Sequence, residues 1–499
     1  MGKNTRQDNY HFIRDVCLSL KTTGLSPRHA LAKRSTEDYP HGWNGPTFGG
    51  MSRTQRLVLV GSILGSFVAF LDIAVINVAL PAIRADLGGG LSAQQWIVDA
   101  YLLSLGSLML IAGSVSDLFG RKRVFAAGLI GFAAASVLCA VAPRVEVLIA
   151  ARALQGVAGA LLVPSSLALI IANFHGAAQG AAIGTWTAWT GVSMIVGPLL
   201  GGALVDAGSW RWVFAINVLP IGATLLVLAR LPPEAPVANR SRVDILGAIL
   251  CAAGLGGVIF GLIEHPTRGW RAPEVAGALI GGLVAFGGFL AHERRASHPM
   301  LDLGLFRNRN FAMGNLTTAV VYAGLTASGF LIPVFLQQVA RYRATAAGLA
   351  LLPVTIMMFA LSPVFGRLSA KHGPRLFMSV GPMVAAAGFG LMSRVGIELD
   401  YARELLPGVL VFGLGLSMTV APLTAAILSD IDERHAGVGS AVNNAVARVA
   451  GLLAVAAVGL LGDASLTSFR RGLWSIAALL LLGGLISAAG IRNRPVRAR

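Results

Sequence analysis

The sequence predicts an all-α integral membrane protein with fourteen transmembrane helices, and three observations support this prediction. Hydrophobic residues make up 55% of the 499 residues and charged residues only 13%, whereas a soluble domain carries about 25% charged residues. The mean hydropathy is +0.70. Fourteen mostly apolar stretches also have roughly the 20 residues that a helix needs to cross a bilayer. Because soluble cores stop growing near about 250–300 residues, the bilayer is the expected solvent for such a chain.

The predicted spans form three groups along the chain. The first six lie at about 57–80, 94–112, 124–142, 146–171, 180–203 and 211–230. A pair follows at about 243–263 and 273–291. The last six lie at about 311–336, 346–365, 375–393, 403–426, 437–461 and 473–491. We therefore expect an N-terminal six-helix half over 51–230, two inserted helices with their linkers over 231–310, and a C-terminal six-helix half over 311–491.

The two ends of the chain differ from this apolar middle. Residues 1–50 are polar, and no apolar run follows their basic residues as a signal peptide would require. We expect a disordered cytoplasmic tail there, with Met51 as an alternative start of the protein. Residues 492–499 contain four arginines and are expected to form a basic cytoplasmic tail.

The distribution of positive charge indicates the orientation in the membrane. The net charge is +17, and outside residues 1–50 the even-numbered loops and the C-terminus hold 18 Lys and Arg residues against 11 in the odd-numbered loops. Because basic loops stay in the cytoplasm, both termini are expected there, and the charge gives no reason to expect a nucleic-acid partner. Cys17, Cys139 and Cys251 stand alone, so neither a disulfide framework nor a metal site is indicated.

An internal duplication explains the two groups of six. The loop GSVSDLFGRKRVF begins at Gly113, and its counterpart GRLSAKHGPRLFM begins at Gly366, an offset of 253 residues. The first and ninth spans start about 254 residues apart, and Gly184 and Gly437 are again separated by 253 residues. Transporters are often built from such repeats.

The loop at Gly113 combines two glycines, a carboxylate and three consecutive cations. Gly113 and Gly120 allow close backbone approach, Asp117 is suited to a helix N-terminus, and Arg121 can bridge to a neighbouring helix. A plain basic anchor is the alternative, although it would not require the G-x-x-x-D-x-x-G-R-K spacing. We interpret these four residues as a conformational switch.

Four stretches together resemble the major facilitator superfamily and, within it, the fourteen-helix drug:proton antiporter branch of EmrB/QacA-like proteins. The loop at Gly113 is similar to the signature loop of that superfamily. LDIAVINVALP at 71–81 resembles the first-span motif, and RALQG at 152–156 resembles the fourth-span motif. GVSMIVGPLLGG resembles the fifth-span antiporter motif, with its key positions at Gly191, Gly197, Pro198, Gly201 and Gly202. The loop copy in the second half has Ala370 and Pro374 in place of Asp117 and Arg121.

The resemblance implies a major facilitator fold and proton-driven export of hydrophobic, often cationic, small molecules by alternating access. An exporter of one endogenous metabolite is the alternative within transport, and a membrane-embedded sensor or enzyme is the alternative outside it. The sequence contains no G-x-x-x-x-G-K-[ST], G-x-S-x-G or HExxH motif, so no enzymatic activity and no cofactor are expected. The expected partners are the small-molecule substrate, protons and lipid, and a functional monomer in a bacterial cytoplasmic membrane is expected.

Few ionisable residues lie within the spans, and such residues are usually functional. Asp72, Asp99 and Arg152 fall at similar depths in their spans, at a rise of about 1.5 Å per residue. A nearby Arg lowers the pKa of a buried carboxyl, so movement of Arg152 would load and release a proton at Asp72. We therefore predict that Asp72, assisted by Arg152 and Asp99, couples transport to protons. A static pair that braces the bundle is the alternative.

Other polar and aromatic residues are candidates for lining a central cavity. They are Asn77, Gln155, Trp186, Trp189, Asn443 and Arg448. For Arg448 a structural hydrogen-bond anchor is equally consistent, and for the two tryptophans packing or lipid contact is the simpler explanation. Gln155 and Asn217 would also fit hydrogen bonds between helices.

Overall fold

The computed structural model describes residues 51–499 except 233–243, 297–298, 302, 397, 430–435, 463–464 and 494–499. The tail expected over 1–50 and most of the basic C-terminal tail lie outside the described residues. Within the described part, all regular elements are helices. Thirteen segments there are long and apolar enough to cross a membrane, and the 30-residue α4 (Gly90–Phe119) occupies the remaining predicted span.

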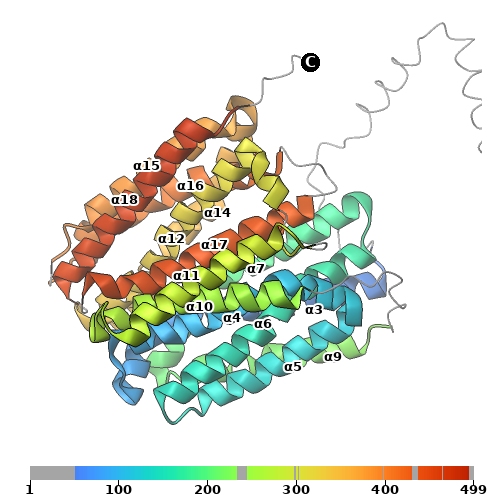
Figure 1. Ribbon diagram of the computed structural model, residues 1–499, viewed down its shortest axis with the longest axis horizontal. Coiled ribbons are helices and arrows are strands. Elements are labelled where there is room, and N and C mark those ends of the chain that lie inside the picture. Colours follow the sequence, from blue (N-terminus) through green and yellow to red (C-terminus); the bar gives the residue numbers. More distant parts are fainter. Residues whose placement is uncertain are drawn as a thin grey trace, which may run out of the picture. The chain divides into compact units, whose positions relative to one another are not determined.

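The first set of helices corresponds to the first six predicted spans (Figure 1). It contains α3 (Arg53–Leu87), α4, α5 (Arg121–Ala140), α6 (Val145–Asn173), α7 (Gly176–Ala207), α8 (Trp212–Ala215) and α9 (Val218–Ala229). α3 starts at a capping box in which Ser52 and Gln55 exchange side-chain-to-backbone hydrogen bonds. The sixth span was expected to be continuous, but a turn at Ile216 and Asn217 separates α8 from α9.

The second set of helices lies at 309–490. It contains α12 (Arg309–Gln338), α13 (Ala344–Leu349), α14 (Leu352–His372), α15 (Pro374–Met392), the short π-helix η3 (Tyr401–Leu405), α16 (Leu406–Ser429), α17 (Ala436–Val458), the 3₁₀ turn η5 (Gly459–Leu461) and α18 (Leu466–Gly490). Its neighbours repeat those of the first set: α12 packs on α17 and α18 as α3 packs on α7 and α9, and α16 packs on α14 and α15 as α6 packs on α4 and α5.

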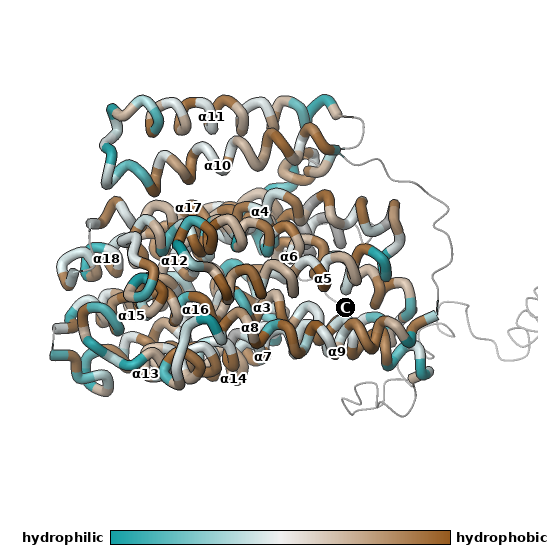
Figure 2. Tube along the Cα trace, turned by 90° about the horizontal axis from the view of Figure 1, so that it is seen from below, coloured by the Kyte–Doolittle hydropathy of each residue, from teal (hydrophilic) through white to brown (hydrophobic). Residues whose placement is uncertain are grey.

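A separate pair of helices joins the two sets. α10 (Ile245–Arg268) packs on α4 and α17, and α11 (Pro273–Glu293) packs mainly on α10. Figure 2 shows this pair as a layer beside the rest of the bundle, with α11 outermost. Exposed apolar side chains such as Ile280, Leu283 and Val284 on α11 are suited to contact with lipid.

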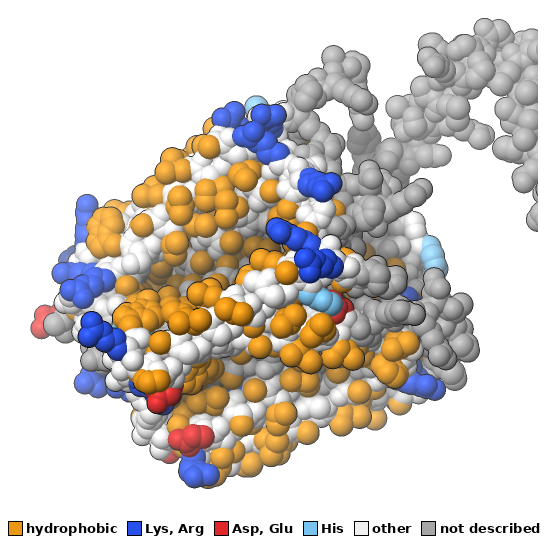
Figure 3. Space-filling model, viewed as in Figure 1, with side chains coloured by type: hydrophobic (Ala, Val, Ile, Leu, Met, Phe, Trp, Pro, Cys, Tyr) orange, Lys and Arg blue, Asp and Glu red, His pale blue; other side chains and the backbone are white. Residues whose placement is uncertain are grey.

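The outer surface has the distribution expected of a membrane-spanning bundle. Figure 3 shows hydrophobic side chains along the helices and Lys and Arg side chains gathered toward the helix ends. Large apolar residues that would be buried in a soluble protein, such as Leu219 and Leu226, are more than half exposed. The fold is therefore that of a multi-pass membrane protein.

The two sets of helices are fastened together near one end of the bundle, where α3 and α12 finish; we call this the closed end. The cross-set hydrogen bonds among described residues lie toward this end, and they join Arg84 to Gln338, Val78 to Gln337, Gln95 to Val455 and Ala456, and Asp206 to Ala344 and Thr345. At the opposite end lie Phe119 of α4 and His372 of α14.

Candidate functional site

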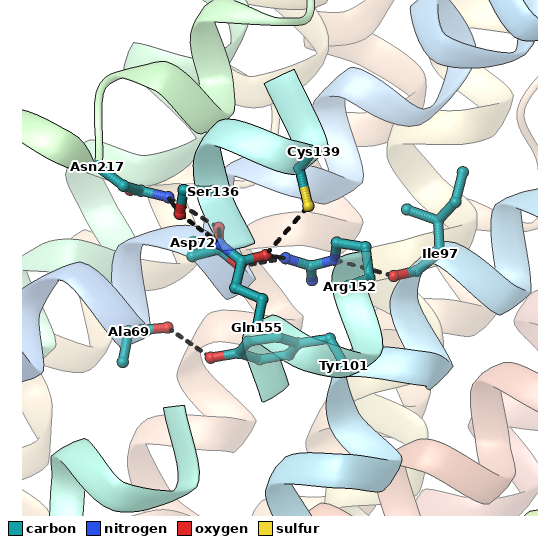
Figure 4. Close-up of polar contacts among 9 residues, drawn as sticks. All are labelled: Ala69, Asp72, Ile97, Tyr101, Ser136, Cys139, Arg152, Gln155 and Asn217. Carbon is teal, nitrogen blue, oxygen red and sulfur yellow. Dashed lines mark hydrogen bonds and ion pairs between the residues drawn. The ribbon is translucent and has the colours of Figure 1, made fainter. Parts of the chain in front are cut away.

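A buried ion pair lies at the centre of the first set. Arg152 Nη1 on α6 donates to Asp72 Oδ2 on α3 at 2.5 Å, and both side chains are 1% exposed (Figure 4). Such a pair is rare within a membrane span, because each charge alone would be costly there. The structure therefore brings together the two residues that the sequence analysis placed at the same depth.

Two amides complete the hydrogen bonding of the Asp72 carboxylate. Gln155 Nε2 and Asn217 Nδ2 donate to Asp72 Oδ1 at 2.9 and 3.0 Å, and both amides also reach Ser136 Oγ. Gln155 Oε1 in turn accepts from Arg152 Nη1 at 2.6 Å. These bonds link α3, α5, α6 and the turn before α9. Gln155 and Asn217 therefore form hydrogen bonds between helices, as the sequence analysis predicts.

Residues of α4 hold the guanidinium of Arg152 from its other side. Arg152 Nε donates to the carbonyl of Ile97 at 3.1 Å, and the guanidinium carbon lies 4.3 Å from the ring centre of Tyr101. Tyr101 is fully buried. The arginine is thus held by a carboxylate, an amide, a carbonyl and an aromatic ring, which together fix its direction.

Asp99 takes no part in this network. Its side chain is fully buried, and neither carboxylate oxygen has a hydrogen-bond partner among the described residues. Asp99 is one turn beyond Gln95, which bonds to carbonyls of α17, so both project toward that helix. Tyr101 is two residues further and faces the opposite side, toward Arg152.

The glycines of α7 permit close contact with two other helices. A Cβ atom on Gly197 or Gly201 would lie 2.4 Å from Ala74 or 2.8 Å from Val75, both on α3. On Gly202 it would lie 2.5 Å from the backbone of Thr345 at the start of α13. The helix runs through Pro198 without a break. This glycine face forms part of the contact at the closed end, whereas Gly191 approaches only the Phe359 side chain.

The remaining candidates for the cavity differ in their surroundings. Trp186 is buried and donates to Ser66 Oγ at 3.1 Å, while Trp189 is 52% exposed. Asn443 on α17 donates to Asn315 and Thr318 of α12, within the second set.

Two further candidates lie near the middle of the bundle. Asn77 Oδ1 is buried without a described partner. The Arg448 guanidinium lies 5.5 Å from the ring centre of Phe70.

The signature loop lies at the end opposite the closed end. Gly113 has open space where a side chain would project, and Gly120 has a φ of +93° that ends α4 and begins α5. Arg121 is the first residue of α5. The side chain of Asp117 lies outside the described residues, so the switch role of this loop stays a prediction.

Two polar residues at important positions were not singled out from the sequence. The ring of Tyr101 lies over the Arg152 guanidinium. Tyr101 follows Asp99 by two residues, so the two side chains lie on opposite faces of α4, and this helix-face argument could have identified Tyr101 from the sequence. Asp206 follows the glycine motif of α7 and bonds to α13 across the two sets. Among the described residues, no group of three or more His, Cys, Asp or Glu is arranged to hold a metal ion.

Comparisons with known proteins agree on one family. Residues 62–455 match the family model described as Major Facilitator Superfamily. A probable actinorhodin transporter of Streptomyces coelicolor is 37% identical over 85% of this chain and 75% of the relative. The multidrug resistance protein Stp of Mycobacterium tuberculosis is 33% identical over 82% of this chain and 76% of the relative. A crystal structure of the peptide transporter POT with sulfate has a TM-score of 0.65 and 14% identity, covering 89% of this chain and 95% of that one.

Proposed function

The chain belongs to the Major Facilitator Superfamily of transporters, and from this premise we propose that it is a proton-coupled exporter of hydrophobic small molecules, drugs or antibiotics among them. The observation that carries the proposal is the buried Asp72–Arg152 pair inside a bundle of spanning helices. Intramembrane ionisable groups of this kind commonly mark proton relays in transporters. The word resistance in the name of the Mycobacterium tuberculosis relative supports the direction of transport.

The three buried charged residues described in the first set, Asp72, Asp99 and Arg152, have distinct roles in this proposal. Asp72 and Arg152 form a pair that separates during the cycle, so that Asp72 accepts a proton only when Arg152 has moved away. Asp99 supplies a second carboxylate for the proton, because it is buried and has no described partner to compensate a charge. Proton entry then drives the exchange between two conformations.

Alternating access assigns the two ends of the bundle to the two sides of the membrane. The larger number of basic residues in the even-numbered loops supports a cytoplasmic position for the signature loop and for both termini. The closed end then faces outward, and the conformation is one in which substrate enters from the cytoplasm. The signature loop, with Asp117 and Arg121, closes the cytoplasmic end in the other conformation.

A dedicated exporter of one product is the second candidate function. The relative named for actinorhodin alone is 37% identical, slightly more than the 33% of the multidrug relative. Competition among unrelated compounds in a transport assay distinguishes the two, because a dedicated exporter is inhibited by its own product and a multidrug exporter by many.

Proteoliposomes that carry only a pH gradient test the proposed coupling. We expect the wild type to concentrate substrate, and we expect Asp72→Asn and Asp99→Asn to bind substrate without moving it uphill. Ser107→Ala is the matched control, because Ser107 is also a buried residue of α4 whose side chain has no described partner. Uphill movement by both aspartate variants under the pH gradient would refute the coupling role.

A further inference from the structure

Arg448 places a positive charge at the junction of the two sets of helices. It projects from α17 of the second set into a small recess formed by α3, α4 and α6 of the first set. The recess is otherwise apolar, and its main lining residues are Phe70, Ile73, Leu105, Met109 and Val163. The guanidinium carbon lies 5.5 Å from the Phe70 ring centre, which places the cation close to an aromatic ring.

No carboxylate of the described residues forms an ion pair with Arg448. Five described pairs exist, and each of them joins other residues. Asp72 precedes Ile73, which lines the recess. The Asp72 carboxylate nevertheless accepts its hydrogen bonds from Arg152, Gln155 and Asn217. The pair of Asp72 with Arg152 is neutral as a whole, so the recess carries the charge of Arg448.

Two neutral hydroxyl groups lie near Arg448. They belong to Tyr101, which is fully buried, and to Tyr322, which is partly buried. A phenol does not compensate a full positive charge. An unpaired charge within a membrane protein is costly, and the cost falls when an anion occupies the site. Tyr101 also contacts Arg152, so a ligand at Arg448 would lie one side chain away from the Asp72 network.

We propose that Arg448 is the charge anchor of the substrate site and that it selects organic anions, in which a flat apolar ring system carries a carboxylate or phenolate. The recess itself is too small for a ring system, so the rings would lie over the partly exposed Phe70 at its edge. The anionic oxygens would accept hydrogen bonds from the guanidinium, whose planar fork suits carboxylate geometry. This inference rests on the proposed export function and replaces the cationic substrate expected from the sequence.

Binding of two related dyes tests this charge preference directly. Fluorescein and rhodamine 123 share a xanthene ring system, but at neutral pH the first is an anion and the second a cation. Fluorescence polarisation with protein in nanodiscs of phosphatidylcholine, a zwitterionic lipid, excludes competition by anionic lipid headgroups. We expect the wild type to bind fluorescein at least about tenfold more tightly than rhodamine 123.

Variants of Arg448 show whether this residue causes the preference. We expect Arg448→Gln to weaken fluorescein binding about tenfold or more and Arg448→Lys to recover part of it, because lysine keeps the charge without the planar fork. Arg403→Gln is the control, since the Arg403 side chain is 88% exposed. Thermal unfolding and size exclusion confirm that each variant is folded.

The outcomes separate this inference from the proposed function. A wild type that prefers rhodamine 123 or binds neither dye overturns the inference, and so does Arg448→Gln that binds fluorescein like the wild type. If binding depends on Arg448 but proteoliposomes show no transport driven by a pH gradient, the anion site stands and the exporter function falls. If transport is driven by the gradient but Arg448→Gln leaves the dye preference unchanged, only the anion site falls.

Discussion

The carboxylate of Asp206, at the end of α7, caps the first turn of α13 through Thr345. Its Oδ2 accepts from Thr345 Oγ1 at 2.6 Å and from the Thr345 backbone N–H at 2.9 Å, while Oδ1 accepts from the backbone N–H of Ala344. A carboxylate near a helix N-terminus is stabilised by the unpaired N–H groups and the helix dipole. Because the two residues belong to different sets of helices, this cap holds the closed end together.

Removing the Asp206 cap is expected to favour opening of the closed end. Hydrogen bonds to a charged group contribute about 1.5–3 kcal/mol, so we expect Asp206→Ala to shift the conformational equilibrium about tenfold or more. Spin labels at Ala207 and Ala346 would report a longer distance in the variant. Asp400→Ala is the matched control, because Asp400 caps η3 within the second set alone. Equal distance distributions in wild type and Asp206→Ala would show that the cap is not a latch.

Gly202 is expected to determine how closely α7 approaches α13. A methyl group there would lie 2.5 Å from Thr345 Cα and 2.7 Å from the carbonyl oxygen of Ala344, both backbone atoms that cannot rotate away. We therefore expect Gly202→Ala to prevent full closure and to reduce export about tenfold or more, as overpacking of a tight contact costs about 1–3 kcal/mol. Gly184→Ala on the same helix, where the Cβ meets open space, should transport like the wild type. Normal export by Gly202→Ala would mean that closure tolerates the methyl group.

Depth along the helices could be predicted from the sequence, but direction around them could not. Counting residues placed Asp72, Arg152 and Asp99 at similar depth, and Asp72 and Arg152 do meet. Asp99 faces α17 instead. It lies two residues before Tyr101, which faces Arg152, and two residues along a helix turn a side chain by about 200°. Which face of α4 meets which neighbour depends on packing between distant segments, and no local pattern encodes it.

Hydropathy also found the spans while missing their polar ends and breaks. The first span was expected at 57–80, yet α3 runs over Arg53–Leu87 because helical hydrogen bonds continue through polar turns. The break before α9 lies at Asn217, whose amide reaches Asp72. The average hydropathy of a whole span does not reveal a short turn within it, so the sequence did not show that the Asn217 amide reaches Asp72.

A pH-sensitive contact joins the start of α10 to the end of α11 in the inserted pair of helices. Asp244 caps α10 by accepting from the backbone N–H of Gly247 at 2.8 Å, and it lies 2.9 Å from His292 Nε2 on α11. Burial raises the pKa of Asp244, but the hydrogen bonds from Gly247 and His292 outweigh this effect and leave its pKa below the ordinary value. A lowered pKa in the folded protein means that the stabilisation is complete above the ordinary pKa and is lost as the pH falls through the lowered one.

We accordingly expect Asp244→Ala to lower the midpoint of thermal unfolding at neutral pH, by the roughly 1 kcal/mol typical of a lost helix cap. The difference from the wild type should shrink in acid below about pH 4, where the Asp244 carboxyl of the wild type takes up a proton as well. Unfolding scans of both proteins across a pH series measure this. A difference that grows toward acid would contradict the assigned sign.

The last prediction concerns the coupling between Asp72 and Arg152. Because Asp72 accepts three hydrogen bonds in a buried site, Asp72→Asn leaves the Arg152 charge without a counter-charge, and removal of one partner of a buried pair costs about 3–5 kcal/mol. We expect a large drop in the thermal unfolding midpoint for Asp72→Asn and for Arg152→Gln alone. The double variant should be more stable than either, because it buries no charge. Transport driven by a pH gradient should stay absent in the double variant, which separates coupling from folding. If the two single effects simply add, the pair does not act as a unit.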